Sequence, residues 1–432
     1  MIIYTVEQGD SLYEISKRFS ADAELIARDN ELRDPSRLTV GQTLVVRTPQ
    51  TLHKVAEGEN IYSVAQKHGV TVNQLWRNNP HLVGGTSLRE GDRLVINDET
   101  PRYGRELAVN AYAYPSVRED VLRKILPYLT YLTIFSYGIE EDGELTDIDD
   151  ERLIELARAY GVAPLMMISN LTPEGYYSPE LVRLMLTDTD IQNILIGEII
   201  RTVAEKRYGG ILLDFEYVPE DISGAYAEFI ERLNEKLGSG GYPVFASASP
   251  RSEGGESGIL YDGHDYASLG TVSDGVMIQS YEWGYMYGEP MPIAPADKVR
   301  DVLKYSDGKV APERLFLGVP DYGYDWSLPY EAGVSRAEPI SNADAVDFAA
   351  EKRAAIEYDS VAQSPFFKYY DRADGTPRAH EVWFGDARSS QAMLDMADEF
   401  KLGGVSVWNA MRYFPQLWLL INGMYNIKKV LR

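Results

Sequence analysis

The stretch Tyr208-Gly-Gly-Ile-Leu-Leu-Asp-Phe-Glu-Tyr217 joins a short apolar run to two carboxylates, Asp214 and Glu216, that are separated by one residue. The run is typical of a buried strand, and side chains two positions apart on a strand point to the same face. The two residues then lie about 6.6 Å apart along the backbone, so their carboxyl groups can meet. Paired charges destabilise a buried strand, whereas a reactive site can use one of them as a protonated acid. The stretch therefore predicts a strand that ends in an acid pair.

Short apolar runs alternate with helix-like stretches from about Glu106 onward. Amphipathic segments such as Ala225–Leu237 lie between most of these runs. Eight strand-and-helix units in about 330 residues predict an α/β fold, a (β/α)₈ TIM barrel with its active site at the C-terminal ends of the strands. The eight candidate strands are Leu107–Tyr114, Leu129–Tyr137, Val162–Ser169, Ile211–Tyr217, Val244–Ser249, Gly275–Tyr281, Leu315–Val319 and Gly404–Trp408.

One stretch of the barrel region, from Trp326 to Phe384, is too long for a single connection between neighbouring elements. It predicts a small α+β insertion after the seventh strand, at about residues 327–385. A helix over Asn342–Tyr358 and a small sheet are expected within it.

The first hundred residues contain an internal repeat. Val6-x-x-Gly9-Asp10-Ser11-Leu12 recurs as Val55-x-x-Gly58-Glu59-Asn60-Ile61, and Leu38-x-x-Gly41-Gln42 recurs as Leu88-x-x-Gly91-Asp92. Each copy predicts a strand, two short helices and a second strand, because a polar capping residue precedes apolar residues at helical spacing. Two small βααβ modules, over residues 1–48 and 49–98, are therefore expected in front of a barrel over residues 102–432.

The composition narrows the classes of function. Lys and Arg total 42 and Asp and Glu total 66, which gives a formal net charge of −24. This charge disfavours nucleic acid and anionic lipid as partners, since both attract positive charge. The chain has no Cys, which excludes disulfides and thiolate metal sites. No zinc site or other cofactor is expected, because the five histidines form neither H-x-H nor H-E-x-x-H: His53, His68, His81, His264 and His380.

The start of the chain, Met1-Ile-Ile-Tyr-Thr-Val-Glu-Gln-Gly9, lacks the basic and apolar regions of a signal peptide. No apolar window is long enough to cross a membrane. We therefore expect no membrane partner, and we expect a route other than ordinary secretion if the protein works outside a cytoplasm.

Two sets of motifs resemble known families. The N-terminal repeat resembles the LysM module, which implies binding to N-acetylglucosamine-containing glycans; the alternative is a spacer or an assembly tag. The larger unit resembles glycoside hydrolase family 18, whose fourth-strand signature D-x-x-D-x-D-x-E reads Gly209-x-x-Leu212-x-Asp214-x-Glu216 here. Gln279-Ser-Tyr281-Glu282 and Gly318-x-Pro320-x-Tyr322-Gly323 match the sixth-strand and seventh-strand motifs. Tandem LysM modules on such a barrel are similar to the spore cortex-lytic N-acetylglucosaminidases of endospore-forming bacteria.

The family resemblance implies retaining hydrolysis in which the 2-acetamido group of the sugar is the nucleophile. In this scheme Glu216 donates the proton, Asp214 orients the acetamide, and Tyr281 hydrogen-bonds its oxygen. Trp408 is expected to form the floor beneath the sugar. Further candidates for substrate contacts are Tyr112, Phe135, Tyr137, Gln279, Glu282, Trp283, Asp321 and Trp326. For each aromatic residue, packing in the core is an equally good interpretation.

The signature departs from the family at Gly209 and Leu212, where acidic residues are expected. Leu212 cannot relay charge into the barrel, so Asp214 is expected to turn inward less readily and the pH optimum to differ from that of relatives with Asp there. Three functions stay open at this point. They are a peptidoglycan N-acetylglucosaminidase of the spore cortex or coat that acts in germination, with spore-coat assembly proteins as further partners; a chitinase; and a non-catalytic glycan-binding lectin.

Overall fold

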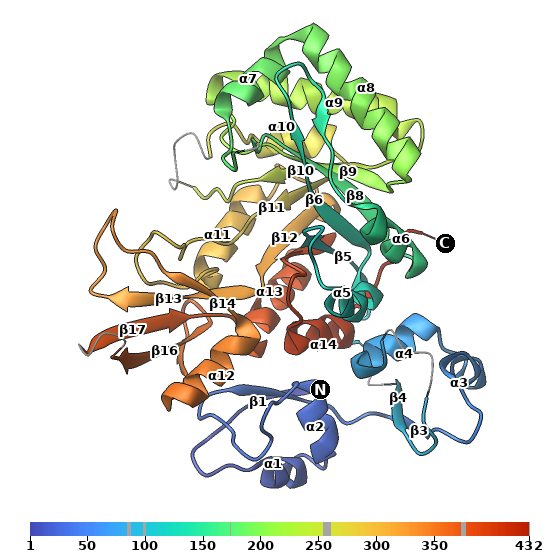
Figure 1. Cartoon of the computed structure of the whole chain (residues 1–432), viewed down its shortest axis with the longest axis vertical. Helices are drawn as coiled ribbons and strands as arrows, with labels where there is room; N and C mark the ends of the chain where they lie inside the picture. Colours follow the sequence, from blue (N-terminus) through green and yellow to red (C-terminus); the bar gives the residue numbers. More distant parts are fainter. Residues whose placement is uncertain (84–87, 98–100, 173, 254–260, 373–376, 432) are drawn as a thin grey trace.

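The computed structural model describes residues 1–83, 88–97, 101–172, 174–253, 261–372 and 377–431. Within these residues, eight parallel strands form a barrel, which β5 closes by pairing with both β18 and β6 (Figure 1). The predicted TIM barrel is therefore confirmed. Its strands are β5 (Glu106–Ala113), β6 (Tyr131–Ile139), β8 (Ala163–Ser169), β9 (Gly210–Asp214), β10 (Val244–Ala248), β11 (Gly275–Ile278), β12 (Leu315–Pro320) and β18 (Gly404–Trp408). The two-residue strands β7 (Leu145–Thr146) and β19 (Asn426–Ile427) extend the sheet at β6 and β5.

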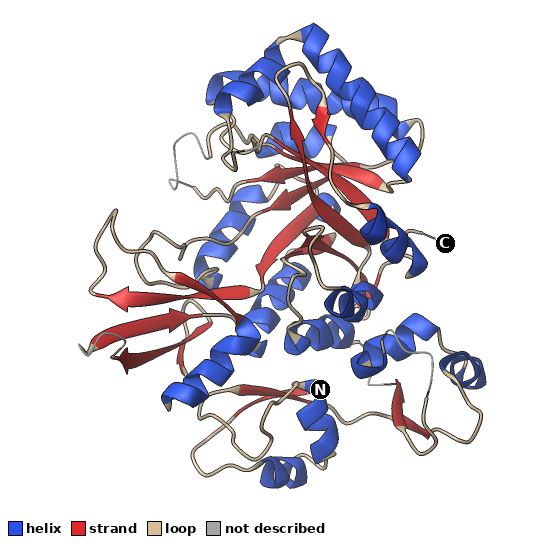
Figure 2. Cartoon of the chain, viewed as in Figure 1, coloured by secondary structure: helices blue, strands red, loops and turns tan. Residues whose placement is uncertain are grey.

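Helices surround the barrel (Figure 2). They are α5 (Glu119–Ile125), α6 (Glu151–Ala159), α7 (Pro179–Thr187), α8 (Thr189–Lys206), α9 (Ser223–Gly238), α10 (Tyr266–Val272), α11 (Ala296–Ser306), α13 (Ala387–Glu399) and α14 (Pro415–Met424). In the described part of the chain, none of the helices combines the length and apolar character that a membrane span requires.

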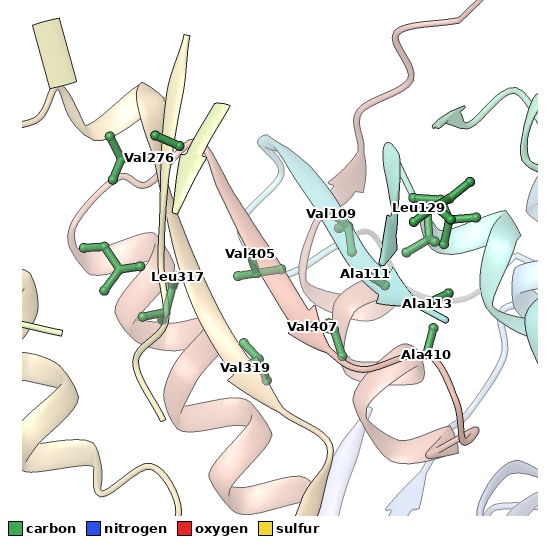
Figure 3. Packing of buried hydrophobic residues seen from close by; sticks show 14 of the residues in the cluster. Val109, Ala111, Ala113, Leu129, Val276, Leu317, Val319, Val405, Val407 and Ala410 are labelled. Carbon is green, nitrogen blue, oxygen red and sulfur yellow. The ribbon is translucent and has the colours of Figure 1, made fainter. Parts of the chain in front are cut away.

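The barrel strands alternate between an outer and an inner apolar layer, as the two-residue period of a strand requires. On β5, Val109 and Ala111 join the outer layer against the helices, whereas Ala108 and Tyr112 join the inner cluster. Figure 3 shows part of the outer layer, including Val109 and Ala111 of β5, Leu317 and Val319 of β12, and Val405 and Val407 of β18. The barrel interior is therefore packed, and any reaction takes place at its rim.

Two strands end three residues earlier than the sequence predicted. β9 ends at Asp214 rather than Tyr217, and β11 ends at Ile278 rather than Tyr281. In the first case the backbone N–H of Glu216 donates to a side chain, Asn170 Oδ1, at 2.8 Å instead of to a neighbouring strand. Tyr217 then takes a positive φ of 56°, which turns the chain away from the sheet.

The insertion after β12 contains one helix and five antiparallel strands in its described residues, in the order β14-β13-β17-β16-β15. Its strands are β13 (Tyr322–Leu328), β14 (Glu338–Ser341), β15 (Glu357–Asp359), β16 (Ser364–Asp371) and β17 (Arg378–Trp383). The sheet begins at Tyr322, four residues before the predicted start at Trp326. The predicted helix is shorter than expected, because α12 (Asn342–Lys352) stops where Arg353 adopts a left-handed φ of 55°.

Both N-terminal modules have the predicted βααβ order. The first contains β1 (Ile2–Thr5), α1 (Leu12–Arg18), α2 (Ala23–Asp29) and β2 (Thr43–Val46). The second contains β3 (Thr51–Lys54), α3 (Ile61–His68), α4 (Val72–Asn78) and β4 (Arg93–Asn97). Ser11 and Asn60 cap the first helix of each copy, as the repeat indicated. The exact domain boundaries stay a prediction, and residue 98 lies outside the described residues.

The two modules are docked on the barrel beneath α14 (Figure 1). The buried Gln416 of α14 uses all four hydrogen-bonding positions of its amide. It donates to Thr43 O at 2.6 Å and Asn30 Oδ1 at 3.1 Å, and it accepts from Thr43 Oγ1 at 3.0 Å and Ala387 N at 3.1 Å. The second module docks through Asn422, which donates to Asn78 Oδ1 at 3.0 Å.

We predict that replacing Gln416 by Ala lowers the free energy of unfolding by about 1–3 kcal/mol, because its partners lose their hydrogen bonds in a buried interface. Urea or thermal unfolding measures the loss. The exposed Gln66 on α3 gives the matched control, and Gln66→Ala should change stability by no more than about 0.5 kcal/mol. Equal stability of the two variants would contradict the docking role of Gln416.

Candidate active site

Most of the predicted site residues gather at the C-terminal end of the barrel strands. Asp214 is the last residue of β9, Trp408 is the last residue of β18, and Gln279 directly follows β11. The side chain of Gln279 donates to Asp214 Oδ1 at 2.9 Å, which links the ends of the two strands that flank β10. This rim is where TIM-barrel enzymes place their reactive groups.

Asp214 at the end of β9 and Glu216 in the loop that follows interact with each other, and both contact the side chain of Gln279. Between them, Phe215 turns outward and stacks on Tyr226 and Phe229, with ring centroids 5.4 and 6.1 Å apart. Phe215 therefore anchors the segment in the helix layer, and its two acidic neighbours face the mouth of the barrel.

The two carboxyl groups titrate differently because their surroundings differ. Burial raises the pKa of Asp214 to about 6, although Ser247 and Gln279 lower it in part. Burial also raises the pKa of Glu216 to about 8, and the charge of Asp214 adds to this rise. Near neutral pH the pair therefore holds one proton. Because the groups interact, a measured titration belongs to the pair.

Tyr281 lies beside the acid pair, in the loop after β11. Burial, followed by the neighbouring Tyr112, Asp214 and Glu216, holds the pKa of Tyr281 well above its ordinary value. Its hydroxyl therefore stays protonated and can donate a hydrogen bond. Tyr281 is partly exposed, so a ligand at the rim can reach it.

Trp408 stands on a group of aromatic rings at the barrel mouth. Its ring lies edge-on to those of Tyr112, Phe135 and Tyr114, at centroid distances of 5.2, 5.7 and 6.2 Å. Tyr112 and Phe135 are buried beneath it, whereas Trp408 and Tyr114 are partly exposed. The structure thus places Trp408 at the surface of the site, with Tyr112 and Phe135 as supports rather than walls.

Two predicted wall residues lie elsewhere. Tyr137 is fully buried in the outer layer, where its hydroxyl donates to Asp150 and Lys206 lies over its ring. Tyr137 would share the inward face of Phe135, two positions earlier, if the strand alternated regularly. The pairing of β6 with β8 is irregular between Ile134 and Tyr137, so this alternation is lost. Trp326 is also fully buried, in the core of the insertion, and its indole N–H donates to Gly288 O at 2.8 Å.

Three further candidates contact the protein rather than the acid pair. Glu282 takes a positive φ of 67° and accepts hydrogen bonds from the hydroxyls of Tyr322 and Tyr324 in the insertion. Asp321 is buried and accepts from Asn342 Nδ2 at 3.3 Å. Trp283 is partly buried against the outer apolar layer.

Sequence reasoning missed two residues next to Glu216. Tyr177, in the loop after β8, has its pKa raised by burial and then by the charges of Asp214 and Glu216. Asn170, the first residue after β8, is fully buried and bonds the backbone of Glu216 at both its N–H and its C=O. The available signal was their position just beyond the end of the third predicted strand.

Leu212 lies fully buried in the inner cluster, two residues before Asp214. Three polar side chains of the interior bond one another: Asn110 donates to Ser406 Oγ at 2.8 Å and accepts from Thr133 Oγ1 at 2.8 Å. The expected effect of Leu212 on the pH optimum stays a prediction.

A TIM barrel with a shared-proton acid pair and a neutral tyrosine at its rim defines a glycosidase type of site. The family model for glycosyl hydrolases family 18 matches residues 111–412, and the LysM domain model matches residues 4–47 and 53–97. The chain therefore belongs to glycosyl hydrolase family 18, and it is a glycoside hydrolase with two LysM domains in front of its barrel.

Several known proteins match the chain, two of them over almost its whole length. The cortical fragment-lytic enzyme of Bacillus subtilis (strain 168) is 34% identical over 435 residues and 99% of both chains. The crystal structure of the spore cortex-lytic enzyme SleL of Bacillus megaterium QM B1551 has a TM-score of 0.83 at 34% identity, again over 99% of both chains. A chitinase of Chromobacterium violaceum ATCC 12472 is 25% identical, with a TM-score of 0.67 over 74% of this chain and 98% of its own.

We predict that Glu216→Gln makes the protein more stable at pH 8 than the parent, with a smaller difference at pH 4.5. The folded-state pKa of Glu216, about 8, lies above its ordinary value of 4.5, so the folded parent binds more protons between these limits and loses stability as the pH rises. The Gln side chain does not titrate, so the variant does not lose stability in this way as the pH rises. Thermal unfolding at both pH values measures the difference.

The exposed Glu220, four residues further along, provides the control for this comparison. Glu220→Gln should shift the melting temperature little at either pH, because its side chain lies in water. A Glu216→Gln variant that gains nothing over the parent between pH 4.5 and pH 8 would contradict the shared-proton arrangement.

Proposed function

We propose that this hydrolase cleaves peptidoglycan of the spore cortex, or fragments released from it, at the bond after N-acetylglucosamine and with retention of configuration. The observation that carries the proposal is the pair of interacting carboxyl groups, Asp214 and Glu216, at the barrel rim, where burial raises the pKa of both. The full-length similarity to cortical fragment-lytic and spore cortex-lytic enzymes supports this substrate. The protein then acts in the spore, in germination, and spore-coat proteins are candidate partners for its assembly there.

The proposed reaction assigns one step to each group. Glu216 gives its proton to the leaving glycosidic oxygen as the bond to the anomeric carbon breaks. The carbonyl oxygen of the 2-acetamido group attacks that carbon from the other face and forms an oxazolinium ion. Asp214 accepts the acetamide N–H and balances the positive charge, while the Tyr281 hydroxyl holds the acetamide in place. Glu216, now a carboxylate, removes a proton from the water that opens the ring.

The remaining contacts hold the substrate. Trp408 offers a partly exposed ring for the sugar face, and Gln279 fixes Asp214 for its contact with the acetamide. The two LysM domains bind the same glycan at separate points, so the local concentration of sugar at the barrel is higher than a lone catalytic domain would experience.

We predict that Glu216→Gln reduces kcat on cortical muropeptides by at least about 100-fold, because the variant cannot donate a proton. Binding of the uncleaved glycan should remain within a few-fold of the parent, since Gln keeps the shape of Glu. Product release followed by chromatography gives kcat, and calorimetry gives the affinity. Glu220→Gln serves as the control and should turn over normally. Full activity of Glu216→Gln would overturn the assignment of the acid.

The polymer specificity needs its own test, because chitin also carries the acetamide that the mechanism uses. We predict that the parent protein releases products with a new N-acetylglucosamine reducing end from cortical fragments and cleaves chitin oligomers at least about tenfold more slowly. De-N-acetylated cortex should resist cleavage, since it lacks the internal nucleophile. Faster cleavage of chitin would favour the chitinase, and binding of all three without cleavage would identify a lectin.

A further inference from the structure

Asn170 forms hydrogen bonds with the backbone on both sides of the Glu216 Cα. Its Oδ1 accepts the N–H of Glu216 at 2.8 Å, and its Nδ2 donates to the C=O of the same residue at 2.9 Å. The second amide hydrogen donates to Ser178 O at 3.1 Å, which ties Asn170 to the start of α7. Asn170 is fully buried, so water does not compete for these bonds.

His264 holds the same segment from the other side. Its Nε2 lies 2.9 Å from Phe215 O, and its Nδ1 lies 3.1 Å from the backbone N of Ser249. The N–H of Ser249 can only donate, so Nδ1 accepts and the proton sits on Nε2, which donates to Phe215 O. Burial lowers the pKa of His264 to about 4, so the ring keeps this neutral form at ordinary pH.

The two side chains meet on one peptide group. The bond between Phe215 and Glu216 presents its C=O to His264 and its N–H to Asn170. β9 has already ended at Asp214, so a side chain at each end of the peptide replaces the pairing that a neighbouring strand would supply. The residue that follows, Tyr217, has a positive φ. The position of the Glu216 carboxyl therefore depends on two side chains that lie 46 and 49 residues away in the sequence.

We propose that Asn170 and His264 are positioning residues that hold the Phe215–Glu216 peptide so that the Glu216 carboxyl stays against Asp214 and in line with the leaving oxygen. This inference rests on the proposed role of Glu216 as the acid. A displacement of about 1 Å at such a group can cost about 100-fold in rate.

The same contacts set the environment in which Glu216 titrates. Two groups act on it directly, Asp214 of β9 and Gln279 after β11. Four tyrosine hydroxyls interact with Glu216 or Asp214 as well: Tyr112 of β5, Tyr177 after β8, Tyr226 of α9 and Tyr281 after β11. The four tyrosines have raised pKa values and stay neutral, and His264 is neutral, so Asp214 supplies the charge. Without the contacts of Asn170 and His264, the Glu216 side chain moves toward water and away from Asp214, and its pKa falls.

The experiment compares Asn170→Ala, His264→Phe and His264→Gln with the parent on a soluble cortical muropeptide. Phe fills the space of the imidazole without a donor, whereas the Gln amide can donate to Phe215 O. We expect kcat to fall about 10–100-fold in Asn170→Ala and His264→Phe, with KM within about threefold, and His264→Gln to recover part of the loss. We also expect the alkaline limb of kcat/KM to move to lower pH in the two impaired variants, because Glu216 must start protonated.

Asn234→Ala is the control for the loss of a side-chain amide contact, here a partly buried one. Asn234 of α9 donates to Val272 O at 2.9 Å, near the C-terminal end of its helix and away from the strand ends that form the site. This variant should lose stability in thermal unfolding but keep the parent kcat and alkaline limb. A merely structural role for Asn170 and His264 would give the same pattern in their variants, and that result would overturn the inference.

The outcomes separate this inference from the proposed function. An inactive Glu216→Gln together with parent-like Asn170→Ala and His264→Phe would refute the positioning role alone. An active Glu216→Gln would refute the proposed function and, with it, the inference. If Asn170→Ala does not fold, the His264 pair decides: equal kcat and equal alkaline limbs in His264→Phe and His264→Gln would overturn the proposal.

Discussion

Burial of two carboxyl groups against each other at the end of β9 is the constraint around which the rim of the barrel is organised. In water both groups would ionise at neutral pH. Burial raises both pKa values here, the charge of Asp214 adds to the rise at Glu216, and the pair keeps one proton. Such an arrangement destabilises the fold and persists only when the surroundings fix it. Phe215 in the helix layer, Gln279 on Asp214, and Asn170 on the Glu216 backbone each contribute to that fixation.

The sequence identified the acid pair because its signal is local. Asp214 and Glu216 stand two residues apart after an apolar run, and strand geometry predicts a common orientation for them. In the structure β9 ends at Asp214, so side chains outside the strand hold the backbone of Glu216. The barrel followed for a similar reason, since each strand is a short apolar run followed by a helical stretch. Asn170 and His264 gave no comparable signal, because their partners lie 46 and 49 residues away and only the closed barrel brings them together. Tyr137 was misplaced for a related reason, since an irregular strand pairing interrupts the alternation that the prediction assumed.

The inner face of the barrel explains how the site tolerates a departure from the family signature. Leu212 occupies a position where an acid is expected, and it packs with Met277 and Phe245 in the inner cluster. In the neighbouring polar layer, the side chains of Asn110, Thr133 and Ser406 form hydrogen bonds with one another. The site therefore keeps its two carboxyl groups at the rim and an uncharged floor below them. We therefore still expect Asp214 to turn inward less readily than in relatives with an acidic residue at position 212.

The docking of the LysM domains has a mechanical consequence. Gln416 and Asn422 bond the two domains to the same helix, α14, and that helix directly follows the strand that ends in Trp408. The LysM domains and the rim of the barrel are therefore held at a spacing that the fold itself sets. For a glycan strand bound by both the LysM domains and the barrel, the distance from the binding points to the rim would be set by the fold rather than by the length of a tether.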